Sequence, residues 1–281
     1  MTQIKEQVRE IQTEDLSPSA AIAAIDLHFP TRGNQKLERL LENADADPQL
    51  KAWWLSAGVN ATKRLGMSDH GWVHIQVVTN IALRILRLIT RRGVEPSIVT
   101  DFQMGRRDAE VVVAAAAMLH DVGMSIHRVD HEAYSLFLAA DKLPSLLEGI
   151  YEEPERSVVA AEIQHAIIGH RSSGRPLTLE AGIVRVADAL DMAAGRSRVP
   201  FEAGQNNIHA LSAAAVDGVT ILPGEAKPVR VEIALNNSAG IFQIDELLGN
   251  KLRGSGLEEL IEVAARVDRQ HEARLLPDLT F

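Results

Sequence analysis

A histidine and an aspartate, His120 and Asp121, stand side by side at the end of a strongly apolar stretch. The preceding residues 109–119 read AEVVVAAAAML, which predicts a helix too apolar to face water. A carboxylate in such surroundings is costly unless it is neutralised, paired or bound to a metal. Seven of the ten histidines fall between His70 and His170 and supply candidate partners. The pattern therefore predicts a metal site made of imidazole and carboxylate groups.

The candidate ligands lie on three separate predicted helices and are His74, His120, Asp121 and Asp188. Side chains from different helices of a bundle can converge on one ion. Because His120 and Asp121 are adjacent, both can bind only if their side chains diverge around the ion, which the end of a helix permits. Such a site leaves coordination positions for water and substrate, as catalytic metal sites do.

The absence of cysteine narrows the chemistry further. It excludes disulfides, iron–sulfur clusters, thiolate zinc sites and cysteine nucleophiles. Imidazole and carboxylate ligands favour Mn, Fe, Zn, Co or Ni over Ca, in one or two ions, and we expect no organic cofactor.

The charge and the apolar runs limit the partners. A net charge of −9 and an aromatic content of 4% make nucleic acid an unlikely partner. The charged N-terminus does not look like a signal peptide, and the longest apolar run, Val111–Leu119, is far too short for a membrane span. We therefore expect a cytoplasmic protein that does not bind membranes.

Helical spacing dominates the first two thirds of the chain. A helix is predicted from about Gly71 to Arg92, in which apolar residues recur after His74. Gly123 is expected to break the helix that delivers His120 and Asp121. Further helices are expected over residues 2–13, 17–26, 35–41, 108–119, 154–170 and 178–194, with another after Asp130.

The pattern changes near residue 200. Residues 219–222 and 229–234 read as two strands, followed by helices over 242–252 and 256–269. The turn in residues 251–259, KLRGSGLEE, is either a weak anion seat at the start of the last helix or a simple connection. The chain is thus predicted to be mainly α, a helical bundle with a small C-terminal α+β domain and a linker at about 200–205.

The order of the candidate ligands resembles that of the HD superfamily of metal-dependent phosphohydrolases. Residues 118–135, MLHDVGMSIHRVDHEAYS, look like its central signature. Residues 74–82, HIQVVTNIA, look like its first-histidine helix, and residues 184–191, VRVADALD, like its last-aspartate helix. The resemblance covers roughly residues 65–195. Together with the change of pattern near residue 200, it divides the chain into an N-terminal helical segment 1–64 packed on the core, an HD catalytic core 65–203 and the α+β domain 204–281. It also implies His74, His120, Asp121 and Asp188 as the metal ligands.

A second metal ion is suggested by similarity to the HD-GYP branch, which uses additional histidines. The candidates are His131, His170 and His165, each of which is otherwise a structural or surface histidine. Residues five apart on a helix lie about 140° around its axis, so His165 and His170 cannot both face one site on an unbroken helix. His170 is the preferred of the two.

This chain departs from that branch in other respects. Adjacent histidines and the Gly-Tyr-Pro motif are missing, and Met124 stands where the branch often has a lysine that donates a proton or anchors phosphate. Proton transfer then falls to another group, such as His127 or His131, or the chemistry differs.

Several further residues are candidates for substrate binding or support of the site. His70 is expected in the first turn of its helix, facing substrate, and Asp191 is expected to orient a ligand or lie at the surface. The arginines that could clamp a phosphate, or else lie solvated in loops, are Arg128, Arg171, Arg196 and Arg198.

We therefore expect a metal-dependent hydrolase of phosphomonoesters or phosphodiesters, acting on a nucleotide or a related small molecule through metal-activated water. Two rivals use the same ligand order: a di-iron redox enzyme similar to inositol oxygenase, and an HD module that senses a nucleotide without turnover. The edge of the predicted C-terminal sheet suggests a homodimer.

Overall fold

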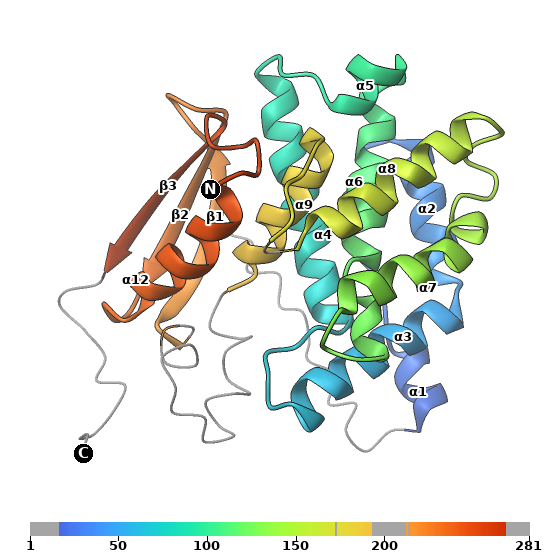
Figure 1. Ribbon diagram of the computed structural model, residues 1–281, viewed down its shortest axis with the longest axis horizontal. Coiled ribbons are helices and arrows are strands. Elements are labelled where there is room, and N and C mark those ends of the chain that lie inside the picture. Colours follow the sequence, from blue (N-terminus) through green and yellow to red (C-terminus); the bar gives the residue numbers. More distant parts are fainter. Residues whose placement is uncertain (1–16, 172, 193–211, 213, 268–281) are drawn as a thin grey trace.

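The computed structural model describes residues 17–171, 173–192, 212 and 214–267. The fold is mainly helical with a C-terminal sheet, which confirms the predicted fold class (Figure 1). The helix expected over 2–13, the linker at 200–205 and the domain boundary at 203/204 lie outside the described residues. The helices before the sheet are α1 Pro18–Ala23, α2 Gln35–Asp45, α3 Pro48–Val59, α4 Trp72–Arg91, α5 Ser97–Phe102, α6 Arg106–Leu119, α7 His131–Leu146, α8 Glu155–Gly169 and α9 Leu179–Leu190.

Helix α6 lies at the centre of the bundle and packs against α4, α8 and α9. Every residue from Val111 to Leu119 is fully buried, which explains a segment that is apolar on all sides. Its four consecutive alanines have small side chains that allow neighbouring helices to approach closely. The carboxyl end of α6 thus delivers His120 and Asp121 into the interior.

Helix α4 carries His74 in its first turn and buries most of its length inside the bundle. Among the described helices it is the one long and apolar enough to cross a membrane by length and composition. Its burial against α6 and α9 accounts for that apolar composition as a core helix.

The turn after α6 packs directly on the start of α7. It forms the 3-10 helix Val122–Ser125, and the Gly123 N–H donates to Ser135 Oγ over 2.9 Å. A Cβ on Gly123 would lie 2.0 Å from the carbonyl oxygen of His131. Gly123 was expected to break a helix; the structure shows that its missing side chain also lets two backbones touch.

The sheet has the order β1-β2-β3, with β1 Val216–Pro223, β2 Val229–Leu235 and β3 Ile261–Val267. Strands β1 and β2 are antiparallel, as expected for a hairpin, and β2 and β3 are parallel. A parallel pair needs a crossover, and the helical stretch Gly240–Leu252, α12 to α13 with a π-helical middle, supplies it.

The helix expected over 256–269 is wrong in its described part, where β3 occupies Ile261–Val267. The segment IEVAARV alternates Ile261, Val263 and Ala265 on one face of the strand, and backbone pairing with β2 favours that period over the helical one. No helix begins in the turn at 251–259 either, and the Gly254 N–H is occupied by the carboxylate of Glu258.

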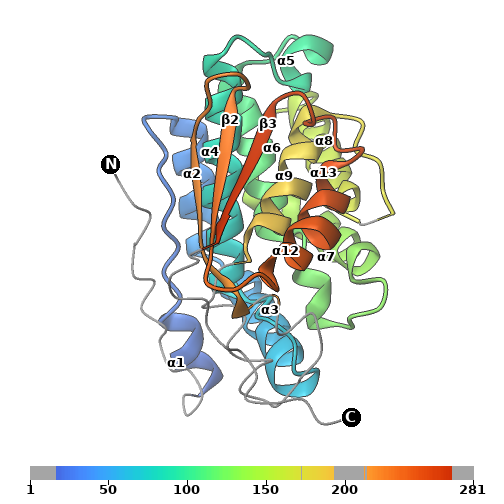
Figure 2. The same ribbon diagram turned by 90° about the vertical axis from the view of Figure 1, so that its left-hand side faces the viewer.

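The C-terminal module, residues 216–267, stands at one side of the bundle beside α4 and α9 (Figures 1 and 2). The contact with α9 is close, since a Cβ on Gly182 would lie 2.3 Å from the carbonyl oxygen of Ser255. This docking brings the crossover helix next to the helix that carries Asp188.

Candidate metal centre

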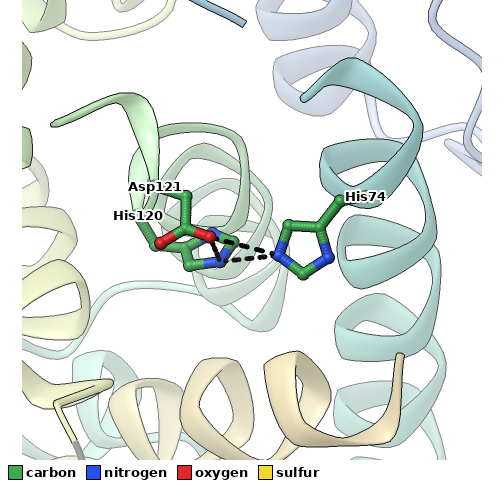
Figure 3. Close-up of side chains that lie close together, drawn as sticks. All are labelled: His74, His120 and Asp121. Atoms are coloured by element: carbon green, nitrogen blue, oxygen red, sulfur yellow. Dashed lines mark hydrogen bonds and ion pairs between the residues drawn. The ribbon is translucent and has the colours of Figure 1, made fainter. Parts of the chain in front are cut away.

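His74, His120 and Asp121 point toward one another from α4 and the end of α6 (Figure 3). The two imidazole Nε2 atoms are 3.2 Å apart, and each lies 3.4 Å from Asp121 Oδ2. All three side chains are buried. The adjacent pair diverges as the hypothesis required, because the chain leaves the helical path between His120 and the following 3-10 turn.

Asp188 adds a fourth ligand atom from α9. Its Oδ1 lies 3.6 Å from His74 Nε2 and 3.8 Å from His120 Nε2. Bonds of about 2.1 Å at tetrahedral angles separate ligand atoms by roughly 3.4 Å. The distance between the two Nε2 atoms, and those from each Nε2 to the two carboxylates, therefore fit one divalent ion.

A second group of possible ligands shares Asp121. The other oxygen of that carboxylate, Oδ1, lies 3.2 Å from His131 Nε2 and 3.7 Å from His170 Nε2. His131 begins α7 and His170 directly follows α8, and both are buried. Asp121 thus lies between two groups, with one oxygen directed to each.

Hydrogen bonds on the outer side of the imidazoles set their tautomers. His120 Nδ1 lies 2.8 Å from the Ala117 carbonyl, and His170 Nδ1 lies 2.6 Å from the Ile167 carbonyl. A carbonyl only accepts, so these Nδ1 atoms carry the hydrogen, and Nε2 is the nitrogen that faces Asp121 and would offer its lone pair to an ion. His74 Nδ1 lies 2.6 Å from Asp191 Oδ2, and this contact gives Asp191 the orienting position proposed for it.

The tautomer of His131 is balanced differently. Its Nδ1 lies 3.0 Å from the Arg128 carbonyl but also 2.8 Å from the Arg128 guanidinium. The carbonyl favours a hydrogen on Nδ1, whereas the guanidinium favours a lone pair there. The Glu132 carboxylate, with Oε2 3.3 Å from Nδ1, is a second acceptor there and also favours a hydrogen on Nδ1.

The charges in the centre are strongly coupled. Burial lowers the pKa of His120, but Asp121 and Asp188 outweigh burial and raise that pKa to about 10. Burial raises the pKa of both Asp121 and Asp188. For Asp121 the nearby His120 outweighs burial, and for Asp188 Lys251 and His120 do so. Each pKa therefore lies well below its usual range. Burial, with the nearby His120 and Lys251, lowers the pKa of His170, which keeps this imidazole neutral.

This donor set fits a divalent transition metal. Lone pairs of buried imidazoles and two ionised carboxylates converge on one small volume, where a positive charge is needed to hold them together. Nitrogen and oxygen donors of this kind suit Mn, Fe, Co, Ni or Zn. In the metal-free protein a proton on His120 supplies part of that charge.

Other candidate residues lie outside the two groups. His165 is half-buried and belongs to neither group, and its Nε2 accepts a hydrogen bond from the Leu177 N–H over 3.0 Å. His70 stands beside His74, with ring centroids 5.5 Å apart. His127 is exposed, and its Nδ1 accepts from the Val129 N–H.

Two of the four candidate arginines lie beside the second group, and the other two lie outside the described residues. Arg171 follows His170 and makes ion pairs with Asp130 at 3.5 Å and Glu132 at 3.8 Å, beside the start of α7. Arg128 contacts His131 as described above. Arg196 and Arg198 lie outside the described residues.

Met124 has no access to the centre. Its side chain is fully buried in a small apolar cluster with Ala57 and Ala61. The chain therefore has no cation at this position.

One cation at the site was missed by the sequence reasoning. The ammonium of Lys251, in α13 of the C-terminal module, lies 3.2 Å from Asp188 Oδ2 and also contacts the His170 carbonyl. The only sequence signal was the basic turn in 251–259, which was read as an anion seat or a connection. Nothing in its spacing ties it to a residue 63 positions earlier.

Comparisons with known proteins agree with this geometry. A family model described as "HD domain" matches residues 72–193, which span all the ligands of both groups. A relative from Methanocaldococcus jannaschii, "Uncharacterized protein MJ1020", is 38% identical over 233 residues, 83% of this chain and 88% of the relative. No solved structure matches the chain.

Proposed function

Because the chain belongs to the HD-domain family, we propose that it is a metal-dependent phosphohydrolase. The proposed substrate is a phosphomonoester or phosphodiester, of a nucleotide or a related small molecule. The observation that carries the proposal is the division of Asp121 between two ligand groups, with Oδ2 beside His74 and His120 and Oδ1 beside His131 and His170.

The residues of the chain would divide the work as follows. His74, His120, Asp121 and Asp188 would hold one ion, and Asp121 with His131 and His170 a second. Ions held there supply charge that polarises a phosphate and activates water. Asp191 and the Ala117 and Ile167 carbonyls keep the imidazoles in the binding tautomer. Arg171, held by Asp130 and Glu132, is available to fix a phosphate oxygen.

The test combines elemental analysis with a panel of phosphatase and phosphodiesterase substrates. The wild type should contain at least one transition-metal ion per chain and release phosphate or cleave a diester. Asp121→Asn should lose metal and activity together. Asp141→Asn, which changes an exposed carboxylate on α7, is the matched control and should retain both. Retained metal with full activity in Asp121→Asn would overturn the site.

A carboxylate shared between two histidine-containing groups also suits a di-iron redox enzyme. Iron content with a charge-transfer spectrum and oxygen consumption would favour that function. A colourless protein with Mn-dependent phosphate release would exclude it. Nucleotide binding that needs no metal would instead favour a sensing module.

We propose further that the protein is a cytoplasmic homodimer and binds neither membranes nor nucleic acid. The dimer is supported by β3, an outer strand whose second edge pairs with no strand in the part of the chain that the structure describes. Light scattering of the full-length protein tests it, and a monomeric mass would exclude it.

A further inference from the structure

Lys251 brings a positive charge from the C-terminal module to the edge of the metal centre. Its side chain is only 14% exposed and lies 3.2 Å from Asp188 Oδ2. Asp188 Oδ1 is the oxygen near His74 and His120, so the carboxylate stands between the lysine and the ligand group. A second N–H of the ammonium donates to the His170 carbonyl. Among the described residues these are its two partners, which leaves one of three N–H donors for a ligand.

Arg185 fixes the backbone from which Lys251 projects. This buried guanidinium donates to the Lys251 carbonyl over 2.9 Å and to the Asn250 carbonyl over 3.3 Å. These carbonyls lie at the carboxyl end of the crossover helix, where backbone acceptors lack helical partners. The same guanidinium binds the carbonyls of Arg171 and Gly174 in the loop after α8. Arg185 therefore joins the module, α9 and that loop at one point.

The position of Lys251 is hard to explain by pairing with Asp188 alone. One divalent ion and the Lys251 ammonium together match the three carboxylates at the centre, Asp121, Asp188 and Asp191, so the proposed second ion leaves unbalanced positive charge beside a nearly buried ammonium. Burying such a charge is costly unless an anion meets it. A phosphate group beside the centre is an anion of the required kind.

We propose that Lys251 binds a phosphate oxygen of the substrate, so that the C-terminal module completes the active site. The inference rests on the proposed function for the identity of that anion. Arg185 acts as a positioning residue in this arrangement, because its guanidinium holds the Lys251 carbonyl in place.

The experiment measures inorganic phosphate binding to the full-length, metal-loaded protein by calorimetry, with metal content determined in parallel. Lys251→Met should bind phosphate about 10- to 100-fold more weakly, because a hydrogen bond to a charged group is lost, with metal content unchanged. Lys251→Arg should retain most of the affinity. The matched control is Arg253→Met, which removes an exposed cation two residues away and should behave as the wild type.

A chemical rescue separates the charge from the fold. The chain has no cysteine, so Lys251→Cys introduces a single thiol. Aminoethylation of that thiol restores an ammonium at nearly the original length, and should restore phosphate affinity. Carbamidomethylation adds a neutral group of similar size and should not. Equal affinity of the two alkylated proteins would overturn the proposal.

The outcomes also separate this inference from the proposed function. If the wild type hydrolyses esters but Lys251→Met keeps its phosphate affinity and KM, the lysine proposal fails and the hydrolase stands. If the wild type hydrolyses nothing, yet Lys251→Met loses phosphate affinity, the hydrolase fails and the lysine remains an anion ligand. Loss of metal in Lys251→Met would show that the lysine only supports Asp188, and would overturn the proposal.

Discussion

Asp191 holds His74 from the side opposite the other ligands. Its Oδ2 lies 2.6 Å from His74 Nδ1, and the other ligand atoms surround Nε2. The acceptor fixes both the ring orientation and the tautomer, and its negative charge makes the ring a stronger base. A residue that touches no ion can therefore set metal affinity.

Asp191→Asn tests this role. The amide keeps the shape but removes the charge, so metal affinity should fall about 10- to 100-fold. Competition with a chelator of known affinity measures the change. Asp141→Asn, on the exposed face of α7, is the control and should leave affinity unchanged. Equal affinities in Asp191→Asn and the wild type would mean that Asp191 does not support His74.

Among single residues, the sequence predicted those candidate ligands whose residue types and order along the chain both indicate a metal site. His120 and Asp121 could be predicted because a costly pair follows an apolar helix, and His74 and Asp188 because they lie in helices on either side in the chain. Lys251 could not, because its approach depends on the docking of a module whose fold the sequence left ambiguous.

Among the elements, the 3-10 turn and α7 control the second ligand group. Asp121 precedes the turn and His131 begins the helix, so the distance between them depends on the backbone contact at Gly123. That contact has no room for a side chain, since a Cβ would also lie 2.5 Å from the Ser135 nitrogen. The packing of two backbones thereby sets a distance between ligands.

Gly123→Ala should push α7 away from the turn and separate His131 from Asp121. We expect a loss of about 1–3 kcal/mol in the free energy of unfolding, as for other overpacked sites. The second group should lose metal affinity while His74 and His120 keep an ion. Elemental analysis and urea unfolding measure the two effects. Gly218→Ala, at a glycine with no atom within 4 Å of the new Cβ, is the control.

A pH-dependent contact secures the start of α6. Asp108 accepts from Lys36 at 2.6 Å, from the Tyr151 hydroxyl at 2.7 Å and from the Gly105 N–H at 2.8 Å. Burial raises the pKa of Asp108, but these donors outweigh it and lower the pKa below the usual value. A depressed pKa contributes stability above the unfolded value of about 3.9, and this contribution is lost as the pH falls through the folded value.

Asp108→Asn should therefore destabilise the metal-free protein by about 1–3 kcal/mol at pH 7. The difference from the wild type should shrink as the pH falls from about 4 through the lowered folded pKa, because Asp108 then becomes protonated in the folded state as well. Urea unfolding in EDTA at several pH values measures it. A difference that stays constant down to acid pH would show that the carboxylate charge is not the cause.

The last strand shows why some elements escaped sequence reasoning. Residues 261–267, IEVAARV, contain helix-forming alanines among β-branched residues, so the local pattern serves either structure. The parallel pairing with β2 decides between them, and that pairing needs the preceding crossover helix. A short stretch of sequence such as residues 261–267 does not reveal a contact between distant segments.

At the scale of the molecule, the metal centre is where the bundle and the C-terminal module meet. The candidate ligands lie on α4, α7 and α9 or directly after α6 and α8, and the module reaches the same point through Lys251. The sheet residues also belong to the same hydrophobic core as α4 and α6. Unfolding of either part must therefore disrupt the centre.

Metal removal should lower the unfolding temperature of the whole molecule in one transition. An ion that binds only the native state stabilises it by about 2.7 kcal/mol at a hundredfold excess over Kd, or roughly 5–10 °C for a chain of this size. Calorimetry with and without EDTA measures the shift. Asp121→Asn should show none, and Asp141→Asn the full shift. Two transitions, of which only one responds to EDTA, would mean that the C-terminal module folds independently of the centre. The packing at Gly182 and Arg185 could then not hold Lys251 at the centre.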